Sequence, residues 1–254
     1  MYSSQISSNL LYHFTKSIDI LISILKNGFW PMIAIEDISF MMPKYKEARV
    51  GIPMVCFTDI PIELADEHRN EYGSFGIGMK KEWGIKNGLN PISYMLKGSE
   101  IYNAYNHLQW IAQQNALELD SGNREGPKTF EMMDAFMNYA GFIKEYSHDA
   151  TLNSKPFYDE REWRYLPPFR DIGVGIDGYC NRLMPAIVDN EKEKEKLNKH
   201  MIQKYTLKFV FDDLETIVVP DQQSASLLCY KLESNDKLFA NKIKIEPVGN
   251  LINN

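Results

Sequence analysis

The chain is poor in cysteine and has no excess of basic residues. Its three cysteines, Cys56, Cys180 and Cys229, are an odd number without the paired spacing of a zinc site or a disulfide framework. Lys and Arg number 28 against 34 Asp and Glu, which gives a net charge of −6. Because phosphate contacts dominate nucleic-acid affinity, this balance disfavours a protein that coats nucleic acid generally, although it is compatible with a local basic groove.

Long hydrophobic runs and targeting signals are also absent. No stretch approaches the roughly 18 uncharged apolar residues of a membrane span. The longest candidate is the region around Ile18–Leu25, which is bounded by Asp19 and Lys26. The first residues, Met1–Gln5, lack the basic flank and apolar run of a signal peptide. We therefore expect a soluble, cytoplasmic protein with no membrane partner.

The common cofactor and metal motifs are missing as well. GxGxxG, GxxxxGK[ST] and HExxH do not occur, so a Rossmann fold, a P-loop and a zincin have no support. Only two carboxylates, Glu160 and Glu162, are clustered, whereas a metal site normally needs more ligands. We predict no metal, and a metal-dependent nuclease or hydrolase ranks last among the functions considered.

What the sequence does contain is an ordinary globular composition. Hydrophobic residues make up 44% and charged residues 24% of the 254 positions, which excludes disordered, collagen-like and coiled-coil chains. Predicted strands and helices mix without a regular βα alternation, which favours an α+β fold over a doubly wound parallel sheet. No linker or repeat divides the chain. We expect one domain over residues 1–254, with residues 97–150 as an inserted helical layer.

Apolar periodicity, caps and turn residues locate the individual elements. Ser17 as N-cap and Gly28 as stop bound a first helix, and Asp59 is the expected cap of the second. Residues 29–50 are expected to be irregular, and 170–185 to form an ordered loop. The predicted strands are 9–15, 52–57, 72–79, 92–96, 161–167, 205–211, 216–219 and 242–245. The predicted helices are 17–27, 60–70, 80–87, 101–119, 128–146, 190–200 and 221–233.

The first candidate site lies in Tyr12–Thr15, at the end of the first predicted strand. A strand end is where a polar side chain can leave the core and meet a ligand. His13 could donate a hydrogen bond from a ring nitrogen to a ribose hydroxyl, with Thr15 in support. The alternative is a histidine whose hydrogen bonds are satisfied inside the structure.

The second candidate is Asp159–Tyr165, where a strand period of two places Glu160, Glu162 and Arg164 on one face. Two carboxylates one pleat apart raise each other's pKa, and one can then act as a base or anchor. Such a carboxylate can also hold a sugar hydroxyl or stabilise an oxocarbenium-like centre. The alternative is a solvated strand face on which Glu162 and Arg164 pair with each other.

The third candidate is the glycine-rich segment Glu71–Gly76. An aromatic ring beside flexible glycines, such as Tyr72 or Phe75, can stack on a flat heterocycle while the backbone approaches closely. The alternative is that both rings are core aromatics of a bent strand. Cys56, in an apolar run, is expected to be packed rather than nucleophilic.

The segments Leu11–Thr15 and Leu21–Phe29 resemble the opening of many ADP-ribosyltransferase-fold proteins. In those proteins a strand carries His and Thr, and a helix with an "IL..G" ending follows. The resemblance is greatest to DNA-targeting ADP-ribosyltransferase toxins and their distant relatives. It implies a split, mixed β-sheet core of the ADP-ribosyltransferase type.

A longer resemblance, over about residues 9–220, is to the AbiGi family of bacterial abortive-infection proteins. These are usually described as the antitoxin half of the AbiG pair. Membership implies anti-phage defence, with a toxin or a phage protein as partner. The residues that carry the resemblance are Val55–Pro61, His68, Tyr72–Gly78, Lys80, Trp83, Asn90, Pro91, Glu160–Arg164 and Leu207–Pro220.

The ADP-ribosyltransferase resemblance implies NAD as substrate, bound in a cleft between two short sheets. By that resemblance His13 would hold the nicotinamide-side ribose, Tyr72 would stack on nicotinamide, and Glu162 would orient the ribose and activate the acceptor. Glu160 gives an E-x-E arrangement like that of the arginine-modifying branch, which however begins with Arg rather than His. This mixture leaves the acceptor open among protein, nucleic acid and small molecule. The other residues assigned to the NAD cleft are Thr15, Thr58, Phe75 and Arg164.

Two functions therefore compete. The first is an enzyme that transfers ADP-ribose or cleaves NAD during phage defence. The second is a catalytically inactive binding protein that neutralises or scaffolds a partner toxin, with an exposed apolar patch on the helical layer 101–146. Convergence of His13, Tyr72 and Glu162 on one pocket is the feature that separates them.

Overall fold

The computed structural model of the chain describes residues 7–41, 48–120, 135–136, 138–147, 155–168, 189–232 and 241–247. The predicted loop 170–185 lies outside these residues, as do residues 128–134 and 137 of the predicted helix 128–146. In the described part of the chain, no helix has the length and apolar character needed to cross a bilayer.

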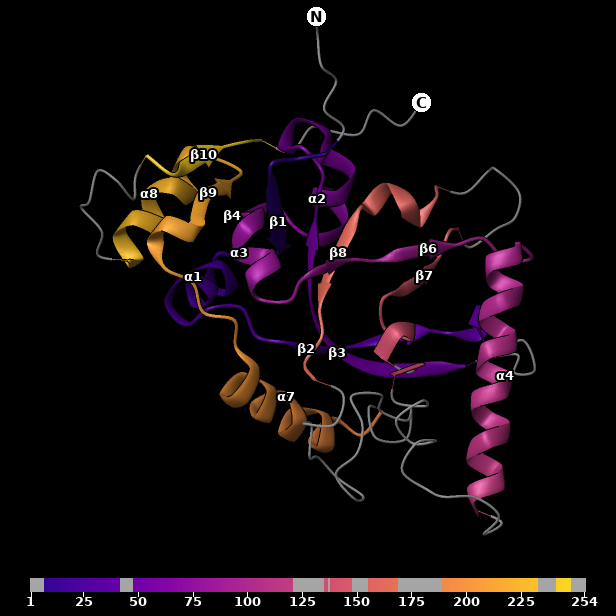
Figure 1. The fold of residues 1–254 in the computed structure, drawn as a ribbon. Helices are drawn as coiled ribbons and strands as arrows, with labels where there is room; N and C mark the ends of the chain where they lie inside the picture. Colours follow the sequence, from indigo (N-terminus) through magenta and orange to yellow (C-terminus); the bar gives the residue numbers. More distant parts are fainter. Residues whose placement is uncertain are drawn as a thin grey trace, which may run out of the picture.

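The centre of the molecule is a mixed β-sheet (Figure 1). Its strands are β1 (Leu10–Thr15), β2 (Met32–Asp37), β3 (Arg49–Thr58), β4 (Phe75–Lys80), β5 (Asn90–Pro91), β8 (Glu162–Tyr165), β9 (Leu214–Val219) and β10 (Ile243–Ile245). Along the order β10-β9-β4-β1-β3-β8-β5, β9 and β10 pair in parallel and the other neighbours are antiparallel. This mixture of sheet and helices confirms the predicted α+β class.

β3 is the strand at which the sheet divides. Its first half, from Arg49 to Met54, pairs with β2, and its second half, from Val55 to Thr58, pairs with β8. β1 joins the second half, where Tyr12 faces Thr58. Where β3 separates from β2, it has β1 on one side and β8 on the other. Side chains from β1, β2, β3 and β8 can therefore converge there.

Helices lie on both sides of this sheet and at its edges. They are α1 (Ile18–Asn27), α2 (Asp66–Tyr72), α3 (Lys81–Lys86), α4 (Glu100–Asp120), α7 (Glu191–Tyr205) and α8 (Gln222–Lys231), with short 3-10 turns η1 (Ser39–Met41), η2 (Ile62–Leu64), η3 (Phe157–Glu160) and η5 (Phe211–Asp213). A second, two-stranded parallel sheet joins β6 (Ser93–Met95) to β7 (Ile143–Glu145). Figure 1 shows α4 at one edge of the molecule beyond this small sheet, with α1 and α8 toward the opposite edge.

The opening strand and helix form as the sequence predicts. Ser17 caps α1 by accepting a hydrogen bond from the Asp19 amide at 3.1 Å, and Gly28 ends the helix with a φ of 89°. The buried face of α1 places Leu21 and Ile24 in the main hydrophobic core, together with side chains of β3, β4, β9 and α8. This packing fixes β1 in the middle of the sheet.

Two predicted segments fold differently between β1 and β4. Residues 29–50, expected to be irregular, contain β2 and η1. The predicted helix 60–70 is divided, because η2 ends at Leu64 and α2 begins at Asp66. Asp59 does not cap either turn, since its carboxylate forms an ion pair with Lys81 at 2.8 Å and accepts a hydrogen bond from Ser7.

Three further predictions are wrong for physical reasons. Tyr72 ends α2 instead of opening a strand, because Gly73 leaves the helix with a φ of 126° and β4 starts only at Phe75. Residues 205–211 are not a strand, because Leu207 makes a single isolated bridge to Phe29. Residues 143–145, expected to be helical, pair in parallel with β6 as β7.

Gly73→Ala is expected to lower the free energy of unfolding by about 3 kcal/mol or more, as for a buried steric clash combined with backbone strain. A Cβ at Gly73 would lie 2.2 Å from the carbonyl carbon and oxygen of Thr15, so the end of α2 would have to move off β1. Urea denaturation of the two proteins measures the loss.

Gly88→Ala is the matched control for this prediction. Gly88 also has a positive φ, 78°, but a Cβ there meets no atom within 4 Å. The strain alone should cost about 1–2 kcal/mol. Equal losses for the two variants would show that the contact between Gly73 and Thr15 does not hold α2 in place.

Candidate active site

Side chains that are distant in the sequence line a single cavity of about 230 Å³. His13 comes from β1, Tyr72 from the end of α2, Glu160 from η3 and Glu162 from β8. The structure thus brings together the imidazole, phenol and carboxyl groups singled out in the sequence, together with the second carboxylate. The other lining residues are Tyr12, Phe14, Ala34, Glu36, Met54, Cys56, Phe57, His68 and Lys144.

Glu162 is held by a buried arginine on its own strand. Arg164 donates from Nε to Glu162 Oε1 at 2.5 Å and from Nη2 to Oε2 at 3.1 Å. The same guanidinium donates to Glu36 Oε2 at 3.2 Å and to the Gly141 carbonyl at 3.1 Å. Glu162 and Arg164 do share one strand face and pair, as one alternative supposed, but the face is buried rather than solvated.

Glu162 is ionised in the folded protein. Burial pushes the pKa of this carboxyl up, but the Arg164 guanidinium and, more weakly, the Lys144 ammonium bring it down to about 2. The expectation that neighbouring carboxylates raise the pKa is therefore wrong for Glu162. Its backbone amide donates to Tyr94 Oη at 3.0 Å, which fixes the strand beneath the carboxylate.

Glu160 reaches the same cavity from a different backbone conformation. Arg161, with a φ of 44°, separates η3 from β8, so Glu160 is not on the strand. Lys144 Nζ nevertheless joins the two carboxylates, at 2.7 Å from Glu160 Oε2 and 3.4 Å from Glu162 Oε2. Burial raises the pKa of Glu160 although Lys144 opposes the rise, and the charge of Glu162 adds to it.

The hydrogen bonds of His13 define which ring nitrogen faces a ligand. Nδ1 lies 2.8 Å from the Cys56 carbonyl oxygen. A carbonyl only accepts, so Nδ1 carries the proton, and burial lowers the pKa of the ring below its usual range. The neutral ring leaves Nε2 as an acceptor, so it would accept a hydrogen bond from a ribose hydroxyl rather than donate one.

Tyr72 belongs to an aromatic wall of the cavity. The residue is 37% exposed, and its ring centroid lies 4.4 Å from that of His68. The His68 ring in turn lies 5.7 Å, centroid to centroid, from the Phe14 ring. Burial, aided by the charge of Lys155, lowers the pKa of His68 to about 4, so this imidazole is neutral near pH 7. The wall thus adds uncharged, flat groups to a cavity that also has charged carboxylates.

Four residues assigned to the NAD cleft do not line this cavity. Thr58 is 1% exposed and donates from Oγ1 to the Glu160 carbonyl at 2.6 Å, so it anchors η3. Thr15 is buried at the end of β1, and its carbonyl lies 2.2 Å from the position that a Cβ on Gly73 would take. Phe75 packs against the main core, and Arg164 lies beneath Glu162.

Sequence reasoning misses four residues around Glu162, namely Glu36, His68, Tyr94 and Lys144. The alternation of Met32–Asp37 is a strand signal that could have located Glu36. Tyr94 lies in a strand that the sequence does predict, but nothing in the sequence indicates that its hydroxyl contacts Glu162. Nothing local marks Lys144, because its strand forms only by pairing with β6.

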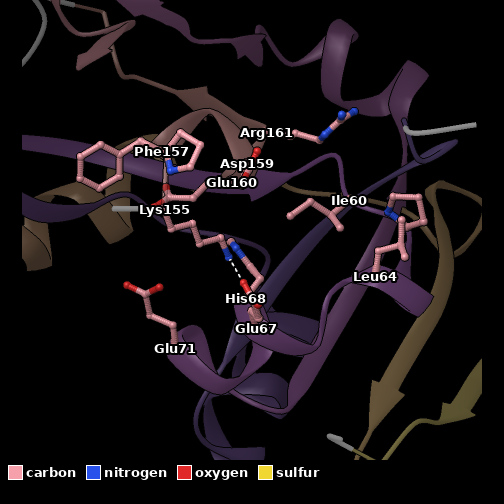
Figure 2. A pocket seen from close by; sticks show the side chains of 12 residues that line it. Ile60, Leu64, Glu67, His68, Glu71, Lys155, Phe157, Asp159, Glu160 and Arg161 are labelled. Atoms are coloured by element: carbon pink, nitrogen blue, oxygen red, sulfur yellow. Dashed lines mark hydrogen bonds and ion pairs between the residues drawn. The ribbon is translucent and has the colours of Figure 1, made fainter. Parts of the chain in front are cut away.

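Two further cavities adjoin the site. One, of about 550 Å³, shares His68 and Glu160 with it; Figure 2 shows walls from η2 and α2 on one side and from residues 155–161 on the other, joined by the Lys155–Glu67 ion pair. The other, of about 330 Å³ and mainly apolar, shares His13 and Tyr72 and extends to α1 and β2. Among the residues that the structure describes, no group of three or more His, Cys, Asp or Glu could hold a metal ion.

Glu162→Gln is expected to lower the free energy of unfolding by about 3 kcal/mol, because it leaves the buried Arg164 short of an anionic partner. Glu36→Gln is the matched control, since the Glu36 side chain is 23% exposed and its loss should cost only about 1 kcal/mol. Denaturant titration at pH 7 measures both. Similar small losses would contradict the assignment of Glu162 as the main partner of Arg164.

Stability is expected to fall as the pH drops from about 6.5 to about 4. In that window the unfolded chain binds a proton at His68 while the folded protein does not, so protonation favours unfolding. His68→Phe keeps the ring contacts with Phe14 and Tyr72 and should make the decline shallower. Thermal unfolding of both proteins across this pH range tests the prediction, and parallel curves would contradict it.

Comparison with known proteins identifies the family to which this chain is similar. The model of the family described as "Putative abortive phage resistance protein AbiGi, antitoxin" matches residues 27–220, which include Tyr72, Glu160 and Glu162 but not His13. An "Abortive phage resistance protein AbiGi" of Lactococcus lactis subsp. cremoris is 31% identical over 135 residues, or 46% of this chain and 52% of that protein.

The chain thus matches about half the length of this relative. No solved structure matches the chain, so the ADP-ribosyltransferase-type core stays a prediction. The AbiGi resemblance drawn from the sequence is confirmed. Since the family model covers most of the sequence, the chain belongs to the AbiGi family.

Proposed function

We propose that this protein acts in abortive phage resistance by binding NAD in the 230 Å³ cavity and cleaving its bond to nicotinamide. The observation that carries the proposal is the convergence of His13, Tyr72 and Glu162 on that cavity from β1, α2 and β8. A neutral acceptor, a partly exposed aromatic ring and an ionised carboxylate are the groups that a ribosyl-nicotinamide needs around it.

The size of the site also suits a ligand larger than nicotinamide riboside. The 230 Å³ cavity alone is below the usual range for ligand pockets, roughly 300–1,000 Å³. It shares five lining residues with the 330 Å³ apolar cavity, so a dinucleotide can extend from one into the other. The shared residues are His13, Ala34, Met54, Cys56 and Tyr72.

Each side chain has a distinct part in the proposed reaction. The Tyr72 ring, with His68 behind it, provides a flat surface for the nicotinamide ring. His13 Nε2 and a Glu162 carboxylate oxygen accept hydrogen bonds from ribose hydroxyls and so orient the sugar. As the bond to nicotinamide stretches, the ionised Glu162 stabilises the positive charge that develops on the ribose, an effect worth about 3 kcal/mol. Nicotinamide leaves with the electron pair of the broken bond, and water or a nucleophile of an acceptor then forms the new bond to the anomeric carbon and gives up its proton to solvent.

Tyr72→Ala is expected to lower kcat/KM for nicotinamide release from NAD by about 10- to 100-fold, since one aromatic stacking contact is lost from the transition state. The substitution should preserve the fold because the side chain is 37% exposed. Chromatographic assay of nicotinamide with the purified protein measures the effect. Tyr230→Ala, at a tyrosine that is 78% exposed on α8, is the control and should keep full activity.

Glu162 is a poor first choice for this test because it also holds Arg164, so its loss mixes catalysis with folding. Absence of nicotinamide release by the folded wild-type protein, in a concentration series that saturates NAD, would contradict the proposal.

A second function, neutralisation of a partner toxin without catalysis, is favoured by the family description as an antitoxin. The two functions differ in their dependence on Tyr72. If the protein acts as a binding antitoxin, Tyr72→Ala and Tyr230→Ala should both protect cells from the toxin as well as the wild type does. If the cavity is required, only Tyr230→Ala should do so. Growth of cells that express the toxin from the same locus measures the difference.

A further inference from the structure

Among the described residues that line the 230 Å³ cavity, Lys144 is the one cation, and Glu36, Glu160 and Glu162 are the three carboxylates. It is supplied by β7, a strand of the small sheet rather than of the main one. Its ammonium lies 2.7 Å from Glu160 Oε2 and 3.4 Å from Glu162 Oε2, and 4.6 Å from the centre of the Phe157 ring. A positive charge of the protein therefore occupies the cavity side of both carboxylates.

Lys144 and Arg164 neutralise the carboxylates from different sides. Arg164 is 1% exposed, does not line the cavity and already donates to both oxygens of Glu162. Lys144 is 17% exposed and lines the cavity directly. Glu162 keeps its arginine if Lys144 is removed, so Lys144 is dispensable for satisfying that buried charge.

We infer that Lys144 determines the charge specificity of the site, because its ammonium lies in the cavity beside Glu160 and Glu162 and repels a cationic group of the ligand. This inference rests on the proposed function and deepens it. The oxidised nicotinamide ring is a cation, whereas the reduced ring is neutral, and both nucleotides carry the same pyrophosphate. Lys144 thus weakens binding of the oxidised form relative to the reduced form.

The size of the effect follows from Coulomb's law. A unit charge about 6 Å from another, at an effective dielectric constant of about 40 for a partly open cavity, corresponds to about a tenfold change in affinity. Removing Lys144 should strengthen binding of the cationic ligand by about this factor and leave binding of the neutral-ring ligand nearly unchanged.

The experiment compares Lys144→Met with two matched controls by titration calorimetry at pH 8. The probes are carba-NAD⁺, whose ribose oxygen is replaced by a methylene so that the bond to nicotinamide is not cleaved, and its reduced counterpart. Lys144→Arg keeps the positive charge. The double variant Lys144→Met/Glu160→Gln removes one charge of each sign and keeps the net charge of the cavity.

The deciding result is the ratio of the dissociation constants of the oxidised and the reduced probe. Lys144→Met should shift it about tenfold toward the oxidised probe, whereas Lys144→Arg and the double variant should stay close to the wild type. An unchanged ratio for Lys144→Met, or the same shift in the double variant, would overturn the role of Lys144 while leaving the proposed function intact. If neither the wild type nor any variant binds either probe, the proposed function fails and this inference fails with it.

Discussion

The buried ion pair between Glu162 and Arg164 is the interaction on which the site depends. Two charges removed from water are stable only when each has partners on every side, and here Glu36, Lys144 and the Gly141 carbonyl complete the set. The contacts tie together β2, β7, β8 and the residues before β7. They also keep Glu162 ionised beside the cavity, so the same arrangement that stabilises the fold prepares a carboxylate for chemistry.

The topology explains why this site can exist at all. β3 changes partners along its length, so β1, β2 and β8 all approach one stretch of the chain around Cys56. Side chains as distant in the sequence as His13 and Glu162, which are 149 positions apart, then face one space. The small sheet adds Tyr94 and Lys144 to the surroundings of Glu162, so the segment 97–150, expected to be a helical insertion, contributes Lys144 to the site.

Elements fixed by local signals are predictable from the sequence, and those fixed by pairing are not. Ser17 and Gly28 mark α1 because a cap and a positive φ are properties of single residues. Tyr72 is misplaced because the glycines after it suggest a strand, although Gly73 instead ends a helix. The convergence of His13 and Glu162 follows from the resemblance, and the strand period offers the pairing of Glu162 with Arg164 as one alternative. The burial of that pair and its contact with Lys144 depend on strand pairing, which leaves little trace in a single sequence.

The central claim is that His13, Tyr72 and Glu162 surround one nucleotide. A crystal structure of the protein with carba-NAD⁺ tests it most directly, because it locates the ligand without relying on turnover. The account predicts the nicotinamide ring against Tyr72 and a ribose hydroxyl within hydrogen-bond distance of Glu162. A nucleotide bound elsewhere, or a cavity that stays empty at saturating ligand, would contradict it.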